Sequence, residues 1–322
     1  MMLKKESQIV STIQKKTMSG NVDNISRTKA YLNYYKNNQE IWWALLASMV
    51  SRNAGWNMTD LKSNWYETLI APQYSYTLFL TFERANWFIF SDAYPQLLLY
   101  EASKNEKRPL FHLLPYFDVS EFMIREWNIF WNCGNLERLC TALIINEQHL
   151  IQRPVIEHPF YSSHVFKSLP YFLVEHLHFN TVLFPTFEGN LYGFSVDKFQ
   201  KVERRIELGK KLAWLLFKSE QSSLIHQFGL QVEPTGSRRD YEKYVKWKIS
   251  KHTPILRTAY SPVLHQRHDY EDWSLSTRNV KRFFKSLTEP KRKYILTNWY
   301  QHKMAELFLA MKIETALIKA FR

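Results

Sequence analysis

Histidine and glutamate residues of the type that bind metal ions gather between positions 147 and 178. Glu147 comes first, and the stretch "IEHPFYSSHVFKSLPYFLVEHLHF" (156–179) adds His158, Glu175 and His178. If that stretch ends in a helix, Glu175 and His178 lie three residues apart on one face and present a carboxylate and an imidazole to one ion. We take these four residues as a candidate metal site. Imidazole and carboxylate ligands suit Zn, Fe or Mn, and we predict no other cofactor.

The same pattern has a structural explanation. Phe, Leu and Tyr fill most gaps in the stretch, so its histidines and glutamates also fit a hydrogen-bonded polar cluster inside a core. Di-iron bundles need a second Glu-x-x-His segment, which this chain lacks. His176 would point away from His178, because neighbouring positions on a helix diverge by about 100°. The sequence therefore leaves open whether the protein is an enzyme.

Positive charge is concentrated in the last two-fifths of the chain. Residues 1–197 hold 17 Lys and Arg against 18 Asp and Glu, whereas residues 198–322 hold 26 against 12. The net charge of +13 thus belongs to the C-terminal part, which predicts a nucleic acid or another polyanion as partner. The predicted contact residues are Arg204, Arg205, Lys246, Lys248, Lys281, Arg282, Lys291, Arg292 and Lys293.

Aromatic residues alternate with these basic residues, as in "STRNVKRFFKSLTEPKRKYILTNWYQHK". Exposed aromatic rings would stack on unpaired bases. Helices with aromatic inner faces and cationic outer faces produce the same alternation. A protein–protein interaction module is a further alternative to polyanion binding and to a metal-dependent enzyme.

A third polar group lies in "SRNAGWNMTDL". Arg52, Asn53, Asn57 and Asp60 stand where one apolar helix is expected to end at Gly55 and the next to begin near Asp60. They form either a buried junction or a site at which Arg52 holds an anion beside a helix N-terminus.

Helical periodicity dominates the elements that must position these residues. We expect helices at 121–131, 136–150 and 197–219, the first opened by a capping box of Asp118 and Glu121. Only "TVLFPTF" and "SYTLFLTF" show strand-like alternation, and 229–275 has the character of a long wrapping connection. The predicted fold class is an all-α, multi-helix globular bundle with few or no strands.

Two parts are predicted from charge and composition: a neutral, aromatic-rich helical body (1–197) and a basic helical part packed on it (198–322), which together form one domain or two. Cys133 and Cys140 lie two helical turns apart, too far for an unstrained disulfide within a helix. The N-terminus is polar, without a signal-peptide region, and no apolar run approaches the ~20 residues that span a bilayer. We predict a cytoplasmic protein. The chain also lacks the P-loop, Gly-x-Gly-x-x-Gly, His-Glu-x-x-His, Cys-x-x-Cys and Gly-x-Ser-x-Gly signatures.

Four segments resemble an uncharacterised domain-of-unknown-function family of bacilli, the YppC-like proteins: "SRNAGWNMTDL", "ERANWFIFSDAYPQLLLYE", "ALIINEQHLIQRPV" and "VERRIELGKKLAWLLF". The resemblance extends over nearly the whole chain. It implies a bacterial cytoplasmic protein and carries no catalytic residues or ligand.

Overall fold

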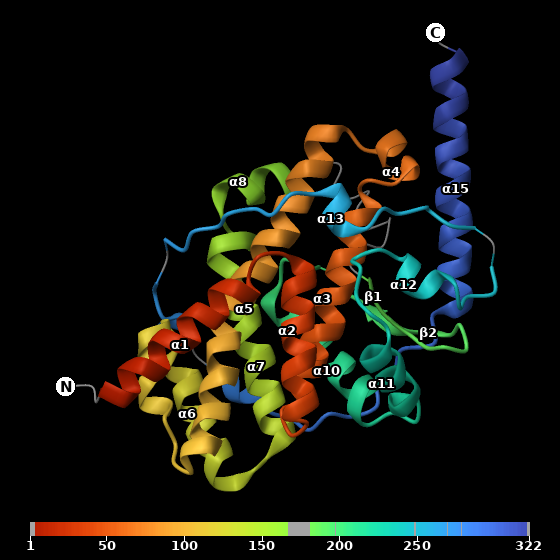
Figure 1. Cartoon of the computed structure of the whole chain (residues 1–322). Coiled ribbons are helices and arrows are strands. Elements are labelled where there is room, and N and C mark those ends of the chain that lie inside the picture. The colour runs from red at the N-terminus through yellow and green to blue at the C-terminus, as the bar shows by residue number, and fades with distance from the viewer. Residues whose placement is uncertain are drawn as a thin grey trace.

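Helices make up most of the chain (Figure 1), so the predicted all-α fold class is confirmed. The computed structural model describes residues 4–166, 181–196, 198–247, 249–268, 270–277 and 279–320. The longer helices are α1 (Lys4–Gly20), α2 (Asn24–Asn37), α3 (Trp42–Asp60), α5 (Pro72–Glu106), α6 (Glu121–Cys133), α7 (Leu136–Leu150), α10 (Val202–Phe217), α11 (Ser222–Gln231) and α15 (Thr297–Ala320). Shorter helical pieces are α4 (Asn64–Leu69), η1 (Phe111–Phe117), η2 (Gln152–Ile156), α8 (Pro159–Tyr161), η3 (Ser162–Phe166), α12 (Arg239–Glu242), α13 (Leu256–Ala259), α14 (Trp273–Ser276) and η4 (Val280–Phe283).

The helices predicted near 121, 136 and 206 are α6, α7 and α10. Asn135 caps α7, its side chain accepting a hydrogen bond from the Arg138 amide at 2.9 Å. The predicted capping box of α6 is wrong. Ser120 caps this helix by accepting from the Met123 amide, and Asp118 precedes it in a left-handed conformation.

Helix α3 runs through the centre of the bundle, and nearly all of its residues are buried. It does not end at Gly55, contrary to the sequence prediction. Gly55 lies inside the helix, where a Cβ atom would be 3.1 Å from the Cα atom of Gly236. The missing side chain of Gly55 thus allows the loop at Gly236 to approach the helix closely, and Gly55 does not form a left-handed cap.

The described part of the chain contains one β-sheet, a hairpin of β1 (Thr181–Pro185) and β2 (Leu191–Ser195). The strands pair antiparallel, with Leu183 opposite Gly193. "TVLFPTF" therefore contains a strand, as expected. "SYTLFLTF" does not: it belongs to α5, where buried Ser75, Leu78 and Phe79 follow the i, i+3, i+4 spacing of a helix.

After α11 the chain wraps around the helices, as the irregular composition of 229–275 predicts (Figure 1). Tyr260 stacks on Phe79 of α5 at 3.7 Å between ring centroids. Farther on, Trp273 of α14 packs on Phe122 of α6. Helix α15 then projects from the body and ends far from it (Figure 1).

One hydrophobic cluster extends from Val10 in α1 to Leu307 in α15. The division between 1–197 and 198–322 therefore separates the chain by charge, while the buried side chains of both parts pack together. Within the described ranges, no helix is long and apolar enough to cross a bilayer.

The contact between Gly55 and Gly236 can be tested by adding a side chain. Gly55→Val should lower the free energy of unfolding by about 1–3 kcal/mol, because the new atoms meet backbone that cannot rotate away. Gly134→Asn is the control: this residue has a left-handed conformation that Asn tolerates and open space around it. Chemical denaturation would measure both, and equal stability of the two variants would mean that the loop does not lie on α3.

Candidate functional site

A segment that we call the strap, residues 279–296, lies along α10. The Lys210 ammonium donates hydrogen bonds to the carbonyls of Phe283 and Lys285, each at 2.7 Å. Arg282 forms an ion pair with Glu203 at 3.0 Å, near the start of α10. These contacts place two basic segments, about 80 residues apart in sequence, side by side.

The end of the strap extends the hairpin. The Gly193 amide donates to the Tyr294 carbonyl at 2.9 Å, and the Leu296 amide donates to the Leu191 carbonyl at 2.8 Å. This pairing carries Lys291–Lys293 to the sheet edge and leads into α15, whose first residue, Thr297, accepts from the Leu191 amide.

Most of the predicted polyanion contacts are exposed. They are Arg204, Lys246, Lys281, Arg282, Lys291, Arg292 and Lys293. Lys248 lies outside the described residues. Lys246 follows Tyr244 and Val245, whose backbone lies against the hairpin turn at Gly189.

Arg205 has a different place from the one predicted. It is only 2% exposed, and its guanidinium donates to the side chains of Gln148 and Gln152 and to the carbonyls of Gln148, Phe199 and Gln200. This arginine therefore links α10 to the end of α7 and contributes nothing to the outer surface. Sequence reasoning also missed three further exposed cations. Lys201 and Lys218 flank α10, and Lys285 lies in the strap.

The aromatic residues of the strap face inward. Tyr294 packs on Trp214 of α10 with 5.4 Å between ring centroids. Phe284 lies beneath the guanidinium of Arg138 at 4.4 Å and also contacts Phe122. The alternation of aromatic and basic residues is thus that of an inner and an outer face, and these rings are not available to stack on bases.

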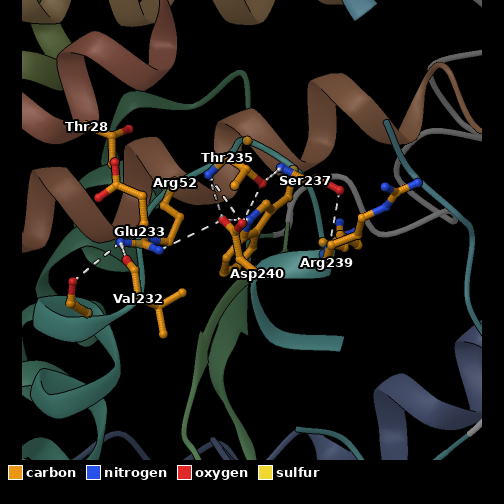
Figure 2. Close-up of polar contacts among 12 residues, drawn as sticks. Thr28, Arg52, Val232, Glu233, Thr235, Ser237, Arg239 and Asp240 are labelled. Carbon is orange, nitrogen blue, oxygen red and sulfur yellow. Dashed lines mark hydrogen bonds and ion pairs between the residues drawn. The ribbon is translucent and has the colours of Figure 1, made fainter. Parts of the chain in front are cut away.

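The four polar residues of α3 are all buried, and Arg52 is directed at the loop after α11. Figure 2 shows it reaching towards the backbone of Val232 and the side chain of Asp240. Its Nη2 donates to the Val232 carbonyl at 2.7 Å, while Nη1 is 3.9 Å from the Asp240 carboxylate. Asp240 in turn accepts from the Thr235 hydroxyl at 2.6 Å and from the Trp56 indole at 3.0 Å.

These contacts correct the anion hypothesis for Arg52. The residue lies inside a continuous helix, so the helix N-terminus that the sequence predicted near Asp60 is not there. Burial lowers the pKa of Arg52, and the Asp240 carboxylate partly offsets this. The arrangement is a buried junction between α3 and the loop 232–240.

Asp60 holds a second set of buried charges. Its carboxylate accepts from Nε of Arg238 at 2.9 and 2.8 Å and from Nζ of Lys251 at 2.8 Å. Asn57 accepts from the same guanidinium at 3.1 Å. One turn earlier, the Asn53 side chain donates to the Leu183 carbonyl and accepts from the Leu183 amide, which fixes β1 on α3.

The described metal candidates do not come together. Glu147 is partly buried, accepting from the Trp43 indole at 3.0 Å and from the Gln148 side-chain amide at 2.9 Å. His158 precedes α8 and packs on Tyr161. Glu175 and His178 lie outside the described residues, as does His176. Among the residues that are described, no three His, Cys, Asp or Glu are placed to hold a metal ion.

Comparison with known proteins gives the family. Residues 19–304 match the family described as "Protein of unknown function (DUF2515)". The chain belongs to the DUF2515 family. It is also 48% identical over 314 residues, 97% of each chain, to the "Uncharacterized protein YppC" of Bacillus subtilis (strain 168). No solved structure matches.

The buried charges of this DUF2515 protein predict a large effect of Asp60→Asn. The change leaves Arg238 and Lys251 buried without their counter-charge, so the free energy of unfolding should fall by about 3–5 kcal/mol. Glu207→Gln is the matched control, since it breaks the exposed ion pair with Arg204 and should cost under about 1 kcal/mol. Urea denaturation distinguishes them; a loss from Asp60→Asn no larger than the control would contradict the proposed role of this cluster.

Glu147 predicts a pH dependence of stability in the same protein. Burial raises the pKa of Glu147 from 4.5 to about 7, outweighing its two hydrogen bonds. The folded state therefore binds the proton more tightly, and this contribution is present below pH 4.5 and lost as pH rises to about 7. Relative to wild type, Glu147→Gln should gain about 3 kcal/mol between pH 4.5 and pH 8.

Asp92→Asn is the control for this pH dependence. Burial raises the pKa of Asp92 from 3.8 to about 6. The difference between this variant and wild type should therefore level off at a lower pH than that of Glu147→Gln. Denaturant titrations across pH 4–8 would show both, and a flat difference for Glu147→Gln would mean that the carboxyl is solvated.

Proposed function

We propose that this protein binds nucleic acid or another polyanion through the outer surface of α10 and the strap. The observation that supports this is the strap's course along α10. The two segments, 201–218 and 279–296, together contain twelve Lys and Arg and three Glu, and every one of these cations except Arg205 is at least partly exposed. Concentrated positive charge on one stretch of surface attracts phosphates, because each neutralised phosphate releases a condensed counterion.

The ion pairs of Arg204 and Arg282 leave these two cations available. Arg204 pairs with Glu207 and Arg282 with Glu203, and all four side chains are close to half exposed. Exposed pairs of this kind contribute little free energy, so phosphate oxygens would replace the glutamates at low cost. We therefore assign Arg204, Lys281, Arg282 and Lys291–Lys293 as contacts, with Lys285 added from the structure.

Contacts of this type would be made with the phosphate backbone and not with bases. The aromatic rings of the strap are used in packing on Trp214, Phe122 and Arg138. Binding should accordingly show little dependence on base sequence. Cys133 and Cys140 are both free thiols. Free thiols fit the predicted location in the reducing cytoplasm, which contains nucleic acids.

Salt dependence tests this proposal. If six of these seven cations each contact a phosphate, the logarithm of affinity for duplex DNA should fall against log salt with a slope of about −5. The triple variant Lys291→Glu, Arg292→Glu, Lys293→Glu should reduce the slope to about −3 and weaken binding equally for different sequences. Fluorescence titration against duplex DNA, single-stranded DNA and RNA at two salt concentrations would measure this.

The matched control reverses the same number of charges elsewhere. Lys4, Lys15 and Lys16 are exposed on α1, so changing them to Glu alters the net charge equally without touching the strap. Equal weakening by both triple variants would indicate a non-local charge effect. Absence of binding at about 50 mM salt, where non-specific attraction is strong, would leave a solvated basic face and favour an interaction module.

A further inference from the structure

An open pocket lies between the end of α11, the hairpin turn and the segment that includes α12. Its volume is about 480 Å³, within the range of about 300–1,000 Å³ that small-molecule sites occupy. Phe187 of the hairpin turn, Val232, Tyr244 and Ile255 form the apolar part of its wall. Apolar surface combined with a few charged groups is typical of a ligand site.

Two cationic side chains line this pocket. Arg239 begins α12 and Lys243 follows its last residue, and both are exposed. Within the described chain, neither side chain forms an ion pair or a hydrogen bond, although the Lys243 ammonium lies 4.9 Å from the centre of the Tyr244 ring. Positions four apart on a helix are neighbours on one face, and like charges there repel each other. An anion bound between them would relieve that repulsion.

The acidic residues of the pocket wall do not neutralise these two cations. Glu233 forms an ion pair with Lys29 of α2. In Figure 2 it lies on the opposite side of Asp240 from Arg239. Asp240 is itself buried, and its carboxylate accepts a hydrogen bond from the Trp56 indole at 3.0 Å. Two positive charges on the wall are therefore left for a ligand.

We propose that this pocket binds a small phosphate monoester, with its phosphate between Arg239 and Lys243 and its organic part on the apolar wall. A phosphate monoester carries a charge of about −1.5 to −2 at pH 7, which matches two cations, whereas a carboxylate matches one. Its oxygens accept two parallel hydrogen bonds from a guanidinium and a further one from an ammonium. None of the described lining residues belongs to the strap, so this site is separate from the polyanion surface.

Phenyl phosphate is the probe, with benzoate and inorganic phosphate as comparators. Calorimetry on the full chain, at about 150 mM salt to screen non-specific attraction, should show one site for phenyl phosphate. Both comparators should bind at least about tenfold more weakly, a difference of about 1.4 kcal/mol. Benzoate offers a single negative charge, and inorganic phosphate makes no contact with the apolar wall. Absence of phenyl phosphate binding, or equal binding of either comparator, would overturn the proposal.

Two variants locate the site. Arg239→Gln and Lys243→Gln each remove one of the two charges and should weaken phenyl phosphate binding at least about tenfold. Both side chains are exposed, so the fold should be retained, which circular dichroism would check. Lys246→Gln is the matched control, because it removes the same charge from a nearby exposed residue that does not line the pocket. Unchanged binding in both pocket variants, or equal weakening by Lys246→Gln, would overturn the assignment.

Discussion

The structure depends on the buried polar side chains of α3, which find their partners in the C-terminal part of the chain. Arg52, Asn53, Asn57 and Asp60 occupy four positions on a helix that is almost wholly buried. An unpaired charge in such a place costs several kcal/mol, so the chain between 183 and 251 must return to this helix. Asn53 fixes the hairpin, Arg52 the loop 232–240, and Asp60 the pair Arg238 and Lys251. The neutral and basic parts are joined there by specific polar contacts as well as by apolar packing.

The basic surface follows from that anchoring. Once Asn53 holds β1 in place, β2 offers its edge to residues 294–296, and this pairing directs the strap back along α10. Aromatic and basic residues alternate along the strap, so its aromatic side chains pack inward while its basic side chains face outward. Charge on this surface contributes little to the fold, since its ion pairs are exposed. The sequence can therefore concentrate cations here without destabilising the packing below.

Periodicity predicted much of this architecture, and its failures share a cause. The helices α6, α7 and α10 were visible because their apolar positions recur at helical spacing. Gly55 was taken for a helix end because close approach by Gly236, 181 residues later, leaves no local signal. Arg204 and Arg205 were assigned one role although neighbouring positions on a helix point in different directions, and only one of them is exposed. The polar residues of α3 were recognised as a group, but their partners come from contacts distant in sequence.

Helix α10 has two faces of different character, because Ile206 and Leu212 are buried while Arg204 lies on the basic surface. A ligand on the outer face shifts a conformational equilibrium only by its difference in affinity between two states. The packing of α10 favours one arrangement. At Gly209 a Cβ atom would lie 2.7 Å from Ile144 of α7. Arg205 donates two hydrogen bonds to Gln148 at the end of α7, one to Gln152 of η2, and two to the Phe199 and Gln200 carbonyls. A helix held this closely has little freedom to move when its outer face is occupied, so the structure favours a rigid basic surface.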